Sequence, residues 1–200
     1  MSNQYFTENP DTPHQLEEWS FTLLGRPFRF VTDSGVFSKK TVDFGSRVLI
    51  DHFSWSELPE GWLLDVGCGY GPIGLSLAAA SGHKVEMIDV NERALGLAQE
   101  NAKRNALLTQ VDIHTSNVYS ETHQKQYAAI VSNPPIRAGK KVVHEILTGA
   151  YERLLPGGSL TVVIQKKQGA PSAEKKMQET FGNVEIVAKD KGYYILKSIR

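Results

Sequence analysis

A run of glycines beside two acidic residues is the first feature of this sequence that could do chemistry. The segment reads Asp65-Val-Gly67-Cys68-Gly69-Tyr70-Gly71-Pro-Ile-Gly74 and follows an apolar stretch. Glycine lets a backbone turn sharply and approach a ligand closely, and a helix that begins beyond the loop offers unpaired N–H groups. Asp89 comes twenty residues after Gly69, a spacing at which a carboxylate could hold a ribose diol. The pattern predicts a site for a flat or anionic ligand, and NAD is one alternative on these residues alone.

A second chemical motif, Asn133-Pro134-Pro135-Ile136, follows another apolar stretch. Consecutive prolines restrict the backbone, so the side-chain oxygen of Asn133 and the carbonyl of Pro134 can be held as fixed acceptors. Fixed acceptors of this kind would bind hydrogen-bond donors of a ligand. An NAD oxidoreductase would have no use for this motif. A simple rigid turn is the alternative interpretation.

Both motifs lie at the ends of predicted strands. Apolar patterning predicts strands over 62–66, 84–89, 111–115, 128–132 and 159–164, and helices over 91–104 and 141–155. Strands separated by helices need right-handed crossovers, which predicts a mostly parallel sheet covered on both faces. The end of the chain differs, because 183–188 and 193–198 flank a tight turn and predict an antiparallel hairpin.

The N-terminal part of the chain has its own pattern. Residues 1–15 are polar with two prolines, and we expect them to be flexible. Alternating residues over 19–24 and 27–32 predict a hairpin, which a loop connects to a helix over 46–53. We therefore expect a flexible segment over 1–15 and one domain over 16–200.

The composition is that of one ordinary globular domain. The 200 residues include 22 basic and 22 acidic side chains, so the net charge is zero and global charge does not favour nucleic-acid binding. There is one cysteine and the six histidines are scattered without zinc-site spacing, so we predict no metal. Neither a membrane-spanning run nor a secretory signal is evident, which predicts a cytoplasmic protein without a membrane partner.

The two motifs together resemble those of a known enzyme class. The glycine segment is similar to the S-adenosylmethionine loop of class I methyltransferases, Asp89 matches their ribose-binding acid, and residues 133–136 match their amino-methylating motif. Residues 33–38, 133–140 and 163–169 further resemble the small-subunit ribosomal RNA guanine-N2 methyltransferases, over about 19–200. The resemblance implies an α/β, Rossmann-like, doubly wound sheet of seven mostly parallel strands with an antiparallel last strand. The N-terminal hairpin is then an extension, and the single domain contrasts with the larger members of the family.

The resemblance also implies a role for individual residues. Catalysis is expected from Asn133, Pro134, Pro135 and Ile136. RNA contacts are expected from Arg137 and Lys140, and base stacking from Phe37 or Tyr70, because Ile136 stands where relatives with other substrates often have an aromatic residue. Asn117 matches a residue that contacts adenine, with an Asx turn as the alternative, and Cys68 is expected to act as a small packing residue. The expected contacts of S-adenosylmethionine are Asp65, Gly67, Cys68, Gly69, Gly71, Asp89, Asn117 and Asn133.

These expectations lead to one predicted function and its alternatives. We expect S-adenosylmethionine-dependent methylation of the exocyclic N2 amine of a guanine in small-subunit ribosomal RNA, presented as RNA or as the small ribosomal subunit. The alternative acceptors are a protein glutamine amide and adenine N6 in DNA or RNA. A catalytically silent fold that binds RNA or a protein is the alternative from another class. The sequence makes no prediction of the oligomeric state.

Overall fold

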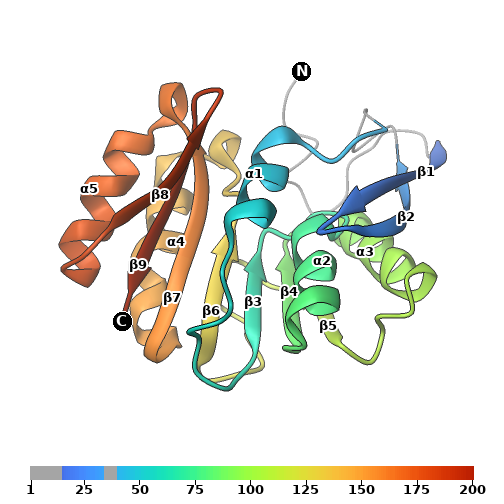
Figure 1. The fold of residues 1–200 in the computed structure, drawn as a ribbon, viewed down its shortest axis with the longest axis horizontal. Coiled ribbons are helices and arrows are strands. Elements are labelled where there is room, and N and C mark those ends of the chain that lie inside the picture. The colour runs from blue at the N-terminus through green and yellow to red at the C-terminus, as the bar shows by residue number, and fades with distance from the viewer. Residues whose placement is uncertain (1–14, 34–39) are drawn as a thin grey trace.

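The computed structural model describes residues 15–33 and 40–200, which form a two-stranded hairpin and a seven-stranded sheet flanked by helices (Figure 1). The strands are β1 Leu16–Leu23, β2 Arg26–Asp33, β3 Leu63–Val66, β4 Val85–Asp89, β5 Val111–Thr115, β6 Tyr127–Ser132, β7 Leu154–Gln165, β8 Glu185–Asp190 and β9 Tyr193–Ile199. The helices are α1 Phe44–His52, α2 Pro72–Ser81, α3 Glu92–Arg104, α4 Lys140–Arg153 and α5 Ala170–Phe181, with short 3-10 helices η1 Ile136–Ala138 and η2 Lys166–Gln168.

The large sheet has the strand order β5-β4-β3-β6-β7-β9-β8. The first five strands in this order pair in parallel, and β9 runs antiparallel to both β7 and β8. The predicted fold class, including the N-terminal hairpin and the antiparallel last strand, is confirmed. The sheet places the carboxyl ends of β3, β4 and β6 along one edge, which is where ligands bind in open α/β sheets.

The predicted end of the helix before β7 is wrong by two residues. Helix α4 ends at Arg153, and Leu154 already has extended backbone angles and pairs with Tyr127. A residue that precedes proline is disfavoured in the helical region, so Leu155 before Pro156 cannot continue the helix. The strand consequently begins earlier than the prediction of 159–164.

Two hydrophobic cores lie on opposite faces of the sheet. Neighbouring residues of one strand belong to different cores, as Leu63 and Leu64 of β3 do, because side chains alternate along a strand. One core takes its helical residues from α1, α2 and α3, and the other takes them from α4 and α5. Burial on both faces explains why the central strands are continuously apolar. In the ranges that the structure describes, no helix has the length and apolar character to cross a membrane.

Asn101 of α3 and Asn105, the C-cap residue of this helix, attach the hairpin to the main domain. Asn101 accepts a hydrogen bond from Val31 N–H at 2.7 Å and donates to the Val31 carbonyl at 3.1 Å. Asn105 makes the equivalent pair of bonds with the backbone of Arg29, at 3.0 and 2.8 Å. The side-chain amides thus pair with an edge of β2 as a neighbouring strand would, which leaves fewer backbone groups unpaired. The hairpin was predicted from its sequence, but this attachment was not.

Candidate functional site

The glycine loop, residues 67–71, connects β3 to α2 over the carboxyl end of β4. Gly67, Gly69 and Gly71 have φ angles of 74°, 57° and 99°, a region that other residues rarely adopt. The N–H groups of Gly67 and Cys68 donate to the carbonyl of Ile88 at 2.8 and 3.0 Å. These positive φ angles give the sharp turn of the chain that the glycines predict.

Two carboxylates fix the glycine loop and the first turn of α2. Asp65 accepts a hydrogen bond from Gly74 N–H at 2.8 Å, and Asp89 accepts one from Gly69 N–H at 2.9 Å. Asp89 also accepts from Asn91 N–H at 2.9 Å. A carboxylate has about four lone-pair positions, so Asp89 keeps the capacity to accept bonds from a diol. Burial raises the pKa of Asp89 and raises that of Asp65 to about 7.

The raised pKa of the buried Asp65 carboxyl group predicts that stability depends on pH. Its folded-state pKa lies above the ordinary value of 3.8, so the folded protein holds this proton more tightly than the unfolded chain does. The resulting stabilisation is complete below the ordinary pKa and is lost as the pH rises through about 7. We expect the melting temperature of the ligand-free protein to fall over this window. Asp65→Asn should remove most of the decline, because asparagine keeps an acceptor for Gly74 N–H.

Thermal unfolding of both proteins between about pH 5 and pH 8 tests this expectation. Glu57→Gln, in the segment between α1 and β3, serves as a control for loss of a carboxylate. An equal slope of melting temperature against pH in wild type and Asp65→Asn would contradict a raised pKa at this position.

Two side chains of the glycine loop face the protein interior. Cys68 is buried, and burial raises the pKa of its thiol, which suits the packing role expected for it. The Tyr70 ring is only 7% exposed and makes edge contacts with Phe30 and Trp19, at centroid distances of 5.5 and 6.0 Å. Tyr70 therefore packs the hairpin against the domain, and the expectation that it stacks on a base is corrected. The other stacking candidate, Phe37, lies outside the described residues.

The proline turn, residues 133–136, follows β6 and lies next to the glycine loop. Ser132 Oγ donates to the Val66 carbonyl at 2.7 Å, which ties the end of β6 to the end of β3. A Cβ atom placed on Gly67 would lie 3.8 Å from Pro135 Cδ. A side chain at position 67 would therefore project into the space between the loop and the turn. The absence of one leaves that space to a ligand, which fits the S-adenosylmethionine that the resemblance implies.

The amide of Asn133 has a defined orientation. Its Nδ2 donates to Asp43 Oδ1 at 3.2 Å and to Ser46 Oγ at 3.1 Å. Asp43 is the N-cap residue of α1 and also accepts from Ser46 N–H at 3.2 Å. Because a carboxylate only accepts hydrogen bonds, the NH2 group must face Asp43, and the side-chain oxygen faces away from it. The Asn133 side-chain oxygen is therefore available as an acceptor with a fixed direction.

The contacts of Asn133 with Asp43 and Ser46 were not predicted from the sequence. Asp43 is 90 positions away from Asn133 in the chain, and no local motif connects the two. One signal was available, because an aspartate before an apolar helical stretch is typical of an N-cap. The cap was not recognised, since the predicted helix began at residue 46 rather than at Phe44.

The remaining predicted site residues are Ile136, Arg137, Lys140 and Asn117. Arg137 in η1 and Lys140 at the start of α4 are exposed, and Ile136 is half-buried against the core beneath α4. Ile136 and Lys140 line a hollow together with His144 and Ile164. Asn117 is exposed in the connection between β5 and β6. Asp65, Gly67, Asp89 and the proline turn therefore meet at one edge of the sheet, with basic side chains beside them.

Comparison with known proteins identifies relatives over nearly the whole chain. The model of the family described as "Methyltransferase small domain" matches residues 27–197. The uncharacterized protein YbxB of Bacillus subtilis is 54% identical over 99% of this chain and 98% of its own length. Ribosomal RNA small subunit methyltransferase C of Aeromonas hydrophila is 36% identical over 77% of this chain and 46% of its own length. The chain thus spans about half the length of that named relative.

Solved structures agree with the sequence relatives. A 16S rRNA N2 methyltransferase of T. Thermophilus, in complex with AdoMet and guanosine, has a TM-score of 0.81 and 26% identity, covering 96% of this chain and 53% of the other. A methyltransferase from Pyrococcus furiosus has a TM-score of 0.65 at 18% identity, over 83% of this chain and 91% of its own, and shows the shared fold. With the family model matched from β2 to β9, the chain belongs to the methyltransferase small domain family.

Proposed function

We propose that this protein, a methyltransferase by family, transfers a methyl group from S-adenosylmethionine to the exocyclic N2 amine of a guanine in small-subunit ribosomal RNA. The observation that carries the proposal is the Asn133 amide. Its nitrogen is fixed on Asp43 and Ser46, so its oxygen is a preorganised acceptor beside the glycine loop.

The reaction divides between the cofactor and the protein. S-adenosylmethionine supplies an electrophilic methyl carbon, so the chain needs only to bind it and to align an amine behind that carbon. Asn133 Oδ1 and the Pro134 carbonyl accept the two amine hydrogens and direct the nitrogen lone pair outward. With S-adenosylmethionine bound, this alignment would let the nitrogen take the methyl group as the carbon–sulfur bond breaks, with the sulfur keeping the bonding electron pair. The surplus proton of the amine leaves to water.

The choice of acceptor rests on the relatives and on the surface beside the turn. Named relatives are ribosomal RNA small subunit methyltransferases, and the relative of known structure carries guanosine. Arg137 and Lys140 are exposed next to the proline turn, where they can meet phosphates. A large-subunit ribosomal RNA methyltransferase of Cronobacter sakazakii, 27% identical, makes the large subunit the second candidate substrate.

Methyl transfer from labelled S-adenosylmethionine tests this function. The substrates are small and large ribosomal subunits, and their naked RNA, from cells that lack the gene. Nucleoside digestion and mass analysis should find new N2-methylguanosine in small-subunit RNA. Label in large-subunit RNA alone would move the assignment to that particle. If S-adenosylmethionine binds tightly and no RNA is labelled, the guanine assignment is wrong and protein amides become the acceptors to test.

The proposed diol contact predicts that a substitution at Asp89 weakens S-adenosylmethionine binding much more than it slows methyl transfer by the saturated enzyme. Asp89→Ala removes two charge-assisted hydrogen bonds to the ribose, so S-adenosylmethionine affinity should fall on the order of 100-fold. Methyl transfer at saturating S-adenosylmethionine should fall far less. Calorimetric titration measures the first and single-turnover kinetics the second. Glu92→Ala, an exposed carboxylate three residues along the chain, is the matched control. Unchanged affinity in Asp89→Ala would contradict the placement of the diol.

A further inference from the structure

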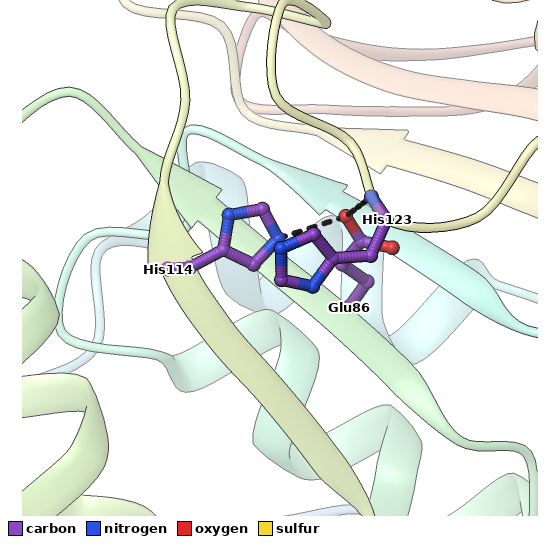
Figure 2. Close-up of side chains that lie close together, drawn as sticks. All are labelled: Glu86, His114 and His123. Atoms are coloured by element: carbon purple, nitrogen blue, oxygen red, sulfur yellow. Dashed lines mark hydrogen bonds and ion pairs between the residues drawn. The ribbon is translucent and has the colours of Figure 1, made fainter.

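Three side chains with metal-binding atoms meet away from the proposed methyl-transfer site. Glu86 lies on β4, His114 on the neighbouring β5, and His123 in the β5–β6 connection, residues 116–126 (Figure 2). One candidate ligand atom from each residue lies within 4.8 Å of the other two. Glu86 is on the same face of the sheet as Ile88, opposite to Asp89, because side chains alternate along the strand. The cluster is therefore separate from the glycine loop.

Both ring nitrogens of His114 have a polar partner. Nδ1 lies 3.1 Å from the carbonyl of Thr115, and Nε2 lies 2.9 Å from Glu86 Oε1. An ion bound by His114 Nε2 and Glu86 Oε1 would take the place of the hydrogen bond between these two atoms.

The second histidine has one ring nitrogen bound to a carboxylate and one left for an ion. His123 Nδ1 lies 2.6 Å from Asp112 Oδ2, so Nδ1 donates to the carboxylate and Nε2 is the atom left for coordination. Metal-ligating histidines characteristically donate their other ring N–H to a carboxylate or a carbonyl. Both His114 and His123 satisfy this condition, each through Nδ1. Asp112 is thus the positioning residue for His123.

We propose that Glu86, His114 and His123 bind a divalent transition-metal ion of the Zn²⁺ type. One carboxylate and two imidazoles are a common protein donor set for Zn²⁺, with water as the fourth ligand. The two imidazole rings are stacked, with centroids 3.7 Å apart and planes 15° apart (Figure 2). An ion binds in the plane of each ring, so coordination requires His123 to turn out of the stack. Its side chain is 51% exposed, which leaves room for that rotation.

A bound ion would fasten the β5–β6 connection to the sheet. No helix fills this connection, and Glu86 already accepts hydrogen bonds from the N–H groups of His123 and Gln124, at 2.7 and 3.2 Å. The same connection carries Asn117 toward the site edge. The proposed role is structural, and it replaces the expectation of no metal drawn from sequence spacing.

Titration of the full-length chain without an affinity tag tests the proposal. ZnCl2 should raise the melting temperature in a manner that EDTA reverses, with one ion bound per chain by calorimetry. CoCl2 should give the visible absorption of a four- or five-coordinate site. His114→Ala and His123→Ala should each weaken Zn²⁺ binding at least tenfold, and Asp112→Ala by about tenfold through loss of the positioning bond.

His52→Ala is the matched control, because His52 lies on α1 and bonds to the carbonyl of Val48 on its own helix. This variant should bind Zn²⁺ as the wild type does. Glu86 is left unchanged, since its removal would leave the buried Tyr127 hydroxyl and the N–H groups of His123 and Gln124 without their acceptor and obscure the result. Absence of a Zn²⁺-dependent shift in the wild type overturns the proposal. Equal Zn²⁺ affinity in the double variant His114→Ala/His123→Ala and in His52→Ala overturns it too.

Discussion

Replacement of Asn133 by alanine is expected to lower the rate of methyl transfer by about 10²–10³-fold, the range seen when one preorganised hydrogen-bonding group of an active site is removed. The variant loses the acceptor that orients the amine, while Asp65 and Asp89 still hold the glycine loop. S-adenosylmethionine affinity should therefore stay within about twofold of the wild type, a change below the free energy of a single hydrogen bond. Single-turnover transfer to the RNA substrate and calorimetric titration measure the two quantities.

A second variant, at Asp43, tests whether the contact between Asn133 and Asp43 contributes to the rate of methyl transfer. Asp43→Ser keeps a side chain that caps a helix N-terminus, but it withdraws the carboxylate that fixes the Asn133 amide. We expect a loss of about tenfold in transfer rate, corresponding to one hydrogen bond of about 1.4 kcal/mol, with a near-normal melting temperature. Full activity in Asn133→Ala would remove the amine-orienting role. A parallel loss of S-adenosylmethionine affinity would make Asn133 a cofactor ligand instead.

The sequence predicts those parts of the molecule that depend on neighbours along the chain. The strand periods, the glycine segment and the prolines after Asn133 each constrain the backbone over a few residues, and the structure has strands and turns at these places. The largest boundary error, at Leu154, arose where a helix passes directly into a strand without an intervening loop. Local pattern does not mark such a junction, because leucine suits both structures.

Contacts between distant segments are the part that local pattern could not predict. Asp43 reaches Asn133 only because α1 packs over the end of the sheet, and Glu86 meets His123 only through the pairing of β4 with β5 and the path of the connection. For Tyr70, local pattern favoured a contact that tertiary packing prevents. Its position in the glycine loop favoured a ligand contact, but the hairpin covers its ring. Side-chain direction at such positions is decided by tertiary packing.

Asn101→Ala is expected to have the largest effect on stability of any single substitution considered, at roughly 3–5 kcal/mol. The amide is fully buried and makes three hydrogen bonds, two to the backbone of Val31 and one to the carbonyl of Tyr70. Alanine leaves these backbone groups without partners in the interior, and each unsatisfied group costs about 1–3 kcal/mol. The midpoint of urea unfolding measures the loss, and the melting temperature should fall by roughly 10 °C.

Gln99→Ala, on the exposed face of the same helix, separates this effect from a change in helix propensity. Its side chain makes one long bond, 3.3 Å, to the carbonyl of Ile113, so its substitution should change stability by less than about 0.5 kcal/mol. Amide hydrogen exchange adds a local test. In Asn101→Ala, protection should fall first in β1 and β2, because Asn101 joins the hairpin to both α3 and the glycine loop. A loss below about 1 kcal/mol, the value of one ordinary hydrogen bond, would mean that core packing rather than the amide holds the hairpin in place.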